Sequence, residues 1–295
     1  MDRLIKEKGY AKINLSLDVL RRRDDGYHEV KMIMQTVGLY DELTFEAKPD
    51  PDITLKVLNV PVGADLGPLE KNLIYRAAKI ILDEAKIDTG VTITLDKHIP
   101  VAAGMAGGST DAAATLRGLN KLFDLNYSDE HLKELGVKLG ADVPYCINGG
   151  TQLSEGIGEI LTPIAAPPSD AYILIAKPDI AVSTKFVYEN LHANTLSYHP
   201  DVDGMMKAME NKDLRDMASK LGNVLETVTV KEYPIIKDIK DTMLNAGALG
   251  SLMSGSGPTV FGLFDDESKA RTAASQISGT GLAKEVFVTN FVFMI

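Results

Sequence analysis

The sequence contains no tryptophan and only one cysteine, Cys146, among its 295 residues. A single cysteine cannot form an internal disulfide and has no second thiol with which to share a metal, so we expect Cys146 to be a buried apolar side chain. No run of about 18 apolar residues is present, and no transmembrane helix is therefore predicted. The first ten residues, MDRLIKEKGY, lack the apolar stretch of a secretory signal, which predicts a cytoplasmic protein.

Positive charge is also in short supply. There are 31 Lys and Arg against 41 Asp and Glu, a formal net charge of −10. A surface that neutralises nucleic-acid phosphates needs clustered Lys and Arg, so nucleic acid is not an expected partner. The one basic run, Arg21 to Arg23, is followed at once by two aspartates, and we interpret it as a solvated turn. Any anion must therefore be bound by a small local site, and no membrane or partner protein is indicated.

Hydrophobic periodicity predicts an α+β protein. From Tyr10 to Leu20, five apolar residues alternate strictly with Lys12, Asn14, Ser16 and Asp18, which predicts a strand with one polar face. Further strands are predicted over residues 31–39, 42–47, 53–58, 91–95, 172–176, 259–264 and 285–291. Helices are predicted over residues 73–85 with Asn72 as cap, 110–123, 129–139 with Ser128 as cap and Gly140 as stop, 184–191, 214–227, 235–246 and 267–277.

The length of the chain allows about two domains. A Pro-Pro step at Pro167 and Pro168 lies in the longest loop-like stretch, residues 164–170. We therefore predict one domain over residues 1–163 and a second over residues 164–295. Helices and strands are segregated along the chain rather than alternating regularly, which favours α+β over a doubly wound α/β sheet.

The strongest chemical signal is a loop of small residues between a predicted strand and a predicted helix. It comprises Pro100, Val101, Ala102, Ala103, Gly104, Met105, Ala106, Gly107, Gly108, Ser109 and Thr110. Glycines let the backbone approach a ligand, and the free N–H groups of a first helical turn bind anions such as phosphate. Taken alone, the loop is explained equally well as a tight turn between a strand and a helix and as a phosphate-binding site. It lacks the Gly-Lys-Ser/Thr ending of a P-loop and the Gly-x-Gly-x-x-Gly spacing of a dinucleotide fold.

Three motifs in order resemble those of the GHMP kinase superfamily, the galacto-, homoserine, mevalonate and phosphomevalonate kinases. The loop is similar to the second motif, residues 11–15 (AKINL) to the first, and residues 253–262 (MSGSGPTVFG) to the third. Within the superfamily, residues 11–43 with their Asp-Gly-Tyr-His box at 25–28 resemble the diphosphocytidyl-methylerythritol kinases of the non-mevalonate isoprenoid pathway. Residues 140–145 and 223–226 also match, so the resemblance covers essentially the whole chain.

The resemblance implies an N-terminal ribosomal S5-like domain with a left-handed crossover and a C-terminal ferredoxin-like domain. It implies ATP-dependent phosphorylation of the 2-hydroxyl of 4-diphosphocytidyl-2-C-methyl-D-erythritol by direct in-line transfer. The expected ligands are therefore ATP and a cytidine-diphosphate-linked alcohol, which meet in the cleft between the domains.

Phosphoryl transfer to an alcohol needs a base for the hydroxyl proton and cations for the charge on the transferred group. The resemblance implies that Asp142 is the base and that Lys12 contacts Asp142 and the reacting groups. From the residues alone, Asp142 lies in a loop past a helix end, before the stiff Val143-Pro144 step, where a turn or capping role is favoured. Asn14 is expected to orient the acceptor.

Recognition of a cytosine ring is the second implied feature. The resemblance implies that Tyr27 stacks on the ring and that His28 reads its edge, since a neutral imidazole can both donate and accept a hydrogen bond. The second stacking ring is expected to be Tyr188, with its neighbour Phe186 as the alternative.

Nucleotide contacts are expected from Asn72 and Lys97 near the adenine and from Gly255, Ser256 and Gly257 beside the phosphates. Asn72 is equally explained as a helix cap. Mg²⁺ is expected with ATP, but its ligands stay unassigned. The hydroxyls of Ser109 and Thr110 are candidates for phosphate or Mg²⁺, although Ser109 equally suits a helix cap.

Two other functions stay open. A different kinase of the superfamily would act on mevalonate, homoserine or a sugar, but these acceptors carry no base for Tyr27 and His28 to bind. A catalytically silent ligand sensor would need neither Lys12 nor Asp142.

The small-residue loop over residues 100–110 departs from its relatives at Ala102, Ala103 and Ala106, where glycine is frequent. A methyl group is tolerated at these positions unless φ is positive.

Overall fold

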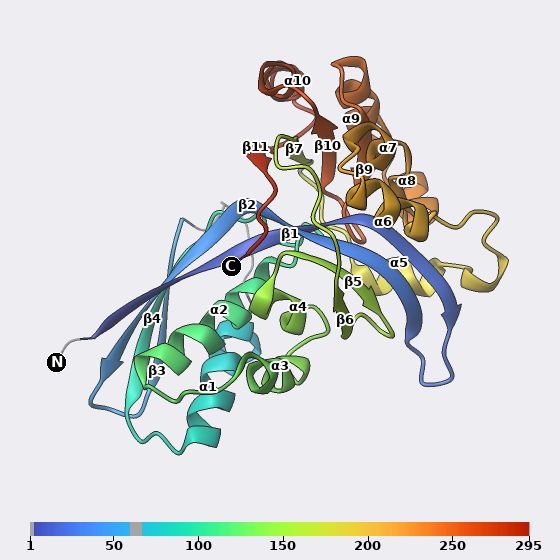
Figure 1. Ribbon diagram of the computed structural model, residues 1–295. Coiled ribbons are helices and arrows are strands. Elements are labelled where there is room, and N and C mark those ends of the chain that lie inside the picture. The colour runs from blue at the N-terminus through green and yellow to red at the C-terminus, as the bar shows by residue number, and fades with distance from the viewer. Residues whose placement is uncertain (1–2, 60–66, 295) are drawn as a thin grey trace.

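The computed structural model describes residues 3–59 and 67–294 and contains two β-sheets (Figure 1). The order in the first sheet is β3 (Ile53–Leu58), β4 (Gly90–Asp96), β2 (His28–Lys48), β1 (Leu4–Arg22) and β8 (Gly222–Asn223). On β2 lies β5 (Thr151–Glu155), which pairs with β6 (Ile160–Pro163). The second sheet has the order β11 (Glu285–Asn290), β7 (Tyr172–Lys177), β10 (Val260–Phe264) and β9 (Gly250–Met253).

The second sheet has a ferredoxin-like arrangement. Its four strands follow one another along the chain as β7, β9, β10 and β11. In the sheet, β7 lies between β11 and β10, and β9 lies at the edge beside β10. All of its neighbours pair antiparallel. The helix α9 (Ile235–Asn245) precedes β9, and α10 (Glu267–Thr280) connects β10 to β11. The ferredoxin-like prediction for the second half is confirmed.

Helices cover the first sheet on one side. They are α1 (Leu73–Ala85), α2 (Gly107–Leu122), α3 (Asp129–Val137) and α4 (Val143–Asn148), and they lie beneath the curved β1–β2 ribbon in Figure 1. The caps predicted for α1 and α3 are confirmed: Asn72 Oδ1 accepts from Ile74 N (2.9 Å) and Ser128 Oγ from His131 N (3.2 Å). The second sheet lies above the same ribbon.

Strand β1 is buried on both faces between these two layers. Ala11, Ile13 and Leu15 pack with the second sheet, whereas Leu17 and Val19 pack in the other core cluster, with α1 and α2. The switch follows from a register shift between Asn14 and Ser16, because one extra residue in a strand reverses which side each later side chain faces. The predicted strict alternation with one polar face is therefore wrong. After this β-bulge, the face of β1 that carries Lys12 and Asn14 continues with Leu17 rather than with Ser16.

Four further helices connect β7 to β9: α5 (Thr184–Asn190), α6 (Val202–Glu210), α7 (Leu214–Ser219) and α8 (Glu226–Glu232). The predicted helix over 214–227 is wrong, because the chain leaves α7 after Ser219 and pairs as β8 with β1 before α8 begins. Gly222 permits this pairing, since a Cβ there would lie 2.4 Å from Tyr198 Oη. Helix α6 was not predicted.

Other boundaries differ by smaller amounts. The strands predicted over 31–39 and 42–47 are one strand, β2, while α2 begins at Gly107 rather than at residue 110. Helix α3 ends at Val137, before Gly140. The domain boundary between residues 163 and 164 stays a prediction. It falls between β6 and β7, although β8 from the second half pairs with β1.

Two expectations about apolar residues can be checked. Cys146 lies in α4, is 2% exposed, and burial raises the pKa of its thiol to about 12, as expected for a packing residue. No helix among residues 3–59 and 67–294 is long and apolar enough to cross a membrane.

The closest approach between α2 and the sheet gives a test of the packing. A Cβ on Gly118 would lie 2.3 Å from Cε2 of the buried Phe45. Alanine gains about 1 kcal/mol of helix propensity, but overpacking costs about 1–3 kcal/mol. We expect Gly118→Ala to lower the free energy of unfolding in urea by up to about 2 kcal/mol. The matched control is Gly279→Ala in α10, where a Cβ meets open space and stability should rise by up to about 1 kcal/mol. Equal stability of both variants would contradict the close contact.

Candidate active site

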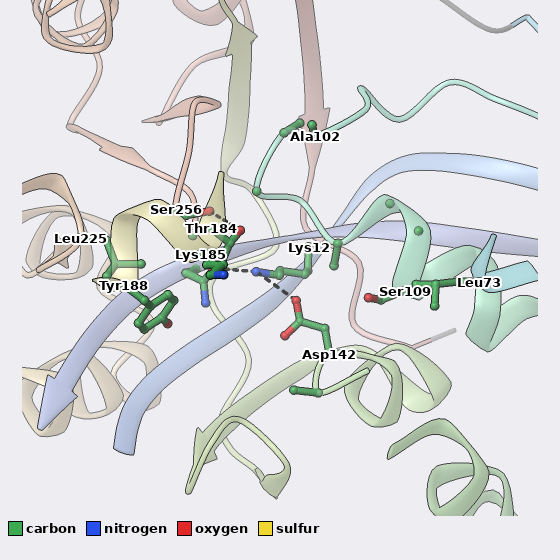
Figure 2. A pocket seen from close by; sticks show the side chains of 18 of the residues that line it. Lys12, Leu73, Ala102, Ser109, Asp142, Thr184, Lys185, Tyr188, Leu225 and Ser256 are labelled. Carbon is green, nitrogen blue, oxygen red and sulfur yellow. Dashed lines mark hydrogen bonds and ion pairs between the residues drawn. The ribbon is translucent and has the colours of Figure 1, made fainter. Parts of the chain in front are cut away.

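A single cavity of about 1060 Å³ brings together residues from β1, β2, the loop before α2, the start of α4, and α5. Its volume is at the upper end for small-molecule sites, which suits two substrates rather than one. In Figure 2, Lys12 and Asp142 lie between two ends of the cavity. Tyr188 and Leu225 mark one end, and Ser109 and Leu73 mark the other.

Lys12 and Asp142 form the centre of the cavity. Lys12 is 5% exposed, and its Nζ donates to Asn14 Oδ1 (2.7 Å) and lies 3.9 Å from Asp142 Oδ2. The expected contact between Lys12 and Asp142 is therefore present. Asp142 does not lie in a free loop: it immediately precedes α4, and Pro144 lies in the first turn of that helix, where proline is favoured. This placement leaves a third of the Asp142 side chain exposed to the cavity.

Three ring side chains line one end of the cavity. The rings of His28 and Tyr188 contact each other, with centroids 5.1 Å apart and planes tilted by 42°. Burial, with Arg22 nearby, lowers the pKa of His28, which favours the neutral imidazole. Tyr27 is 61% exposed at the rim. Of the two candidate stacking residues, Tyr188 lines the cavity and Phe186 does not.

The loop before α2 lines the other end. Residues 100–104 and 106–109 contribute to the wall, and Ser109 faces the cavity in Figure 2. Two of the predicted loop residues, Met105 and Thr110, do not line the cavity. Met105 is 1% exposed within the apolar core, and the buried hydroxyl of Thr110 donates to Tyr10 O (2.8 Å). The suggestion that Ser109 caps α2 is also wrong, because the N-cap is Ala106 and its side chain makes no capping bond.

Two alanines of this loop adopt left-handed backbone conformations. Ala102 has φ of 52° and Ala106 has φ of 59°. A positive φ is the conformation in which a methyl group is poorly tolerated, and both alanines adopt it. Such a conformation costs an L-residue about 1–2 kcal/mol. Gly104 has φ of 72°, and a Cβ there would lie 2.3 Å from Ser254 O. The loop is thus a strained segment held by its neighbours.

Lys97 lies on the cavity wall within a buried charged cluster. Its Nζ forms ion pairs with Asp41 and, at 3.1 Å, with Asp111. Burial opposes the charge on Lys97, but Asp111 and Asp41 together raise its pKa. Burial also raises the pKa of Asp111 well above its usual range, and the nearby Asp41 acts in the same direction. Asn72 lies on the same wall while it caps α1.

Asp41 was not singled out in the sequence. Its Oδ1 accepts from His98 N (2.5 Å) and Ile99 N (2.8 Å), so it fixes the chain just before the loop as well as Lys97. In the sequence it follows Tyr40 between two predicted strands, which is typical of an ordinary turn residue. The pairing of β2 with β4 brings it beside Lys97, although Asp41 itself does not line the cavity.

The third glycine motif contributes Gly255 and Ser256 to the wall, whereas Gly257 does not line the cavity. The hydroxyls of Ser256 and Thr184 are 2.8 Å apart, which connects the motif to α5 (Figure 2). Further lining residues were missed by sequence reasoning: Arg22, Lys71, Leu73, Thr184, Lys185 and Leu225. Arg22 shows that the basic run is more than a solvated turn, although Arg21 and Arg23 do pair with local acids.

Within residues 3–59 and 67–294, no three His, Cys, Asp or Glu residues are placed to hold a metal ion. Mg²⁺ that accompanies ATP is usually held by one or two carboxylates together with substrate phosphates. Among the lining groups, Asp142, Glu189 and the Ser109 hydroxyl suit such a cation, as does Asp111, which is ion-paired with Lys97. The donor set therefore fits a metal carried mainly by the nucleotide.

Comparisons with known proteins agree with this geometry. Residues 72–150 match the family described as GHMP kinases N terminal domain, and residues 205–281 match GHMP kinases C terminal. A 4-diphosphocytidyl-2-C-methyl-D-erythritol kinase of Lachnoclostridium phytofermentans is 54% identical, over 98% of this chain and 97% of its own. The corresponding kinase of Clostridium perfringens is 49% identical, over 98% of both chains.

Solved structures give the same result. A 4-(cytidine 5'-diphospho)-2C-methyl-D-erythritol kinase superposes with a TM-score of 0.82 at 31% identity, over 97% of this chain and 98% of its own. A homoserine kinase from Cytophaga hutchinsonii has a TM-score of 0.79 at 20% identity, over 100% and 96%, and shares the fold. The α+β fold is that of the GHMP kinases, and the chain belongs to their 4-diphosphocytidyl-2-C-methyl-D-erythritol kinase family.

Proposed function

We propose that the protein transfers the γ-phosphate of ATP to the 2-hydroxyl of 4-diphosphocytidyl-2-C-methyl-D-erythritol in the non-mevalonate isoprenoid pathway. The observation that carries this proposal is the position of Lys12 and Asp142 between a phosphate-binding loop and a pair of rings suited to a pyrimidine. The names of the relatives support the choice of acceptor.

The transfer is proposed to be direct and in line. Asp142 takes the proton of the acceptor hydroxyl, whose oxygen forms a bond to the γ-phosphorus while the bond from that phosphorus to the β-phosphate oxygen breaks. ADP leaves with the electron pair of that bond. Lys12 Nζ, 3.9 Å from the Asp142 carboxylate, stabilises the charge on the transferred group.

The loop and α2 hold the polyphosphate. The N–H groups of Gly107, Gly108 and Ser109 lie in the first turn of α2, and they have no partner within the helix because no helical carbonyl lies four residues before them. Mg²⁺ supplies further neutralisation of the phosphate charge when bound with ATP. Asn72 and Lys97 form the wall proposed to face the adenine.

The acceptor is selected at the other end. A neutral His28 both donates and accepts, which matches the edge of cytosine, and Tyr27 and Tyr188 provide faces for stacking. Mevalonate, homoserine and galactose carry no base to occupy this end.

Replacing the proposed base tests the mechanism. We expect Asp142→Asn to lower kcat by about 10²–10⁴-fold while the affinity for a non-hydrolysable ATP analogue changes little, because general base catalysis contributes about that factor. ADP release would be measured with ATP, Mg²⁺ and each of four acceptors in parallel. Asp129→Asn is the matched control, since Asp129 is exposed and accepts a hydrogen bond from Asn148, the last residue of α4.

Turnover on the cytidine substrate alone, lost in Asp142→Asn and kept in Asp129→Asn, is the expected result. Turnover on mevalonate, homoserine or galactose instead would replace the proposed acceptor. Nucleotide binding without ADP release from any acceptor would favour a ligand sensor.

The lowered pKa of His28 predicts a pH dependence of acceptor binding. The neutral imidazole is the binding form, and a pKa below the usual value of about 6.5 keeps it neutral at pH 7. KM for the acceptor should change little from about pH 8 to pH 7 and rise as the pH falls through and below about 6.5. His28→Gln, which cannot protonate, should have a higher KM that is flat below pH 6.5. A KM for the wild type that already rises between pH 8 and pH 7 would contradict a neutral His28.

A further inference from the structure

The segment Asn223–Glu226 has no place in the reaction described so far. Asn223 is 4% exposed, and its side-chain amide uses both its donor and its acceptor atoms. Nδ2 donates to Met253 O and to Gly255 O, each at 2.8 Å, and Oδ1 accepts from Leu225 N at 2.9 Å. Both carbonyls that it holds belong to the third glycine motif. Asn223 itself does not line the cavity, whereas Leu225 does.

The backbone of Asn223 belongs to the first sheet, whereas the third glycine motif that its side chain holds begins in β9 of the second sheet. As part of β8 it pairs with Leu17 of β1, and the next N–H, of Val224, donates to Leu17 O (3.0 Å). Strand β1 also carries Lys12. One residue therefore joins the strand of the catalytic lysine, through its main chain, to the third glycine motif, through its side chain.

Two more hydrogen bonds close a circuit around the cavity. Ser254 Oγ donates to Gly104 O (3.0 Å), which connects the third motif to the phosphate-binding loop. The N–H of Lys12 donates to Met105 O (3.2 Å), which connects that loop back to β1. The circuit thus runs from β1 through Asn223 and Ser254 to the loop and returns at Lys12.

Glu226 holds the same motif from its other side. Its Oε1 accepts from Met253 N (2.9 Å), and Lys240 donates to both carboxylate oxygens (2.7 and 2.6 Å). From α8, Thr229 donates to Ser256 O at 3.2 Å. The motif is therefore clamped near each end, and Asn223 is the member of the clamp that also reaches the first sheet.

We propose that Asn223 is a positioning residue for phosphoryl transfer: it fixes the third glycine motif, and through Ser254 the phosphate-binding loop, at a set distance from Lys12. The proposal rests on the proposed kinase function. Only an amide suits this position, because two carbonyls need donors while Leu225 N needs an acceptor. An aspartate of the same shape has no donor to offer, and its charge would face the Met253 and Gly255 carbonyls.

The test compares Asn223→Asp with Asn120→Asp. Asn120 also uses its amide on backbone, donating to Tyr127 O and accepting from Tyr127 N (3.0 Å each), but lies at the far end of α2. Each variant would be assayed well below its melting temperature. We expect kcat of Asn223→Asp to fall by about 30- to 100-fold with KM for the acceptor unchanged, since a small misplacement of reacting groups costs up to about 10²-fold. Asn120→Asp should keep kcat within about twofold.

A second measurement does not depend on the acceptor. Calorimetry should show that Asn223→Asp binds a non-hydrolysable ATP analogue about tenfold more weakly but adenosine as well as the wild type does, because only the phosphates reach the two glycine loops. A general loss of stability would instead weaken the binding of both the ATP analogue and adenosine. A wild type without turnover would refute the proposed function, and this binding arm would still test the role of Asn223.

Ser254→Ala removes the next link of the circuit and covers the case in which Asn223→Asp fails to fold. It should show the same fall in kcat and the same selective loss of the ATP analogue. The proposal is overturned if Ser254→Ala matches the wild type, or if Asn223→Asp differs from Asn120→Asp only in melting temperature.

Discussion

A buried ammonium group on a central strand is the constraint on which the site depends. Lys12 is 5% exposed on β1, and removing a charge from water costs several kcal/mol unless partners compensate. Asn14 supplies one hydrogen bond at 2.7 Å, while the Asp142 carboxylate stays at 3.9 Å. The compensation in the free protein is thus incomplete, and an anionic phosphoryl group between Lys12 and Asp142 would complete it. In the proposed reaction, Lys12 would therefore stabilise the transferred phosphoryl group more strongly than a solvated lysine would.

Residues from both halves of the chain build the cavity around that lysine. Alternation along β1 presents Lys12 and Asn14 to the cavity while Ile13 and Leu15 face the second sheet, and the bulge after Asn14 then turns Leu17 toward the first core. The third glycine motif arrives from the second sheet and meets the phosphate-binding loop at Gly104, where there is no room for a Cβ. The proposed nucleotide end therefore depends on how the two sheets pack, and its strained loop is held by hydrogen bonds from Ser254 Oγ to Gly104 O and from Lys12 N to Met105 O.

Local features of this structure were predictable from sequence, and non-local ones were not. The caps Asn72 and Ser128 and the helix over 73–85 depend on residues a few positions apart, so their patterns sufficed. The bulge in β1 and the strand β8 depend on pairing between distant segments, so alternation and helical spacing gave wrong answers there. Asp41 escaped notice for the same reason. The proposed roles of Lys12, Asp142 and the ring residues came from resemblance, because an acid before Val-Pro or a lysine in a strand has no unique meaning.

The two ends of the cavity differ in how firmly they are built. The phosphate end is made of the first turn of a buried helix, a cluster of Lys97, Asp41 and Asp111, and two interlocked glycine loops. The acceptor end is made of Tyr27, 61% exposed at the tip of the β1–β2 hairpin, and Tyr188 on the short helix α5. Exposed hairpin tips and short helices accept substitutions at little cost in stability, whereas a buried charged cluster does not. On this fold, the proposed acceptor end can therefore change while the end proposed to hold the triphosphate stays the same.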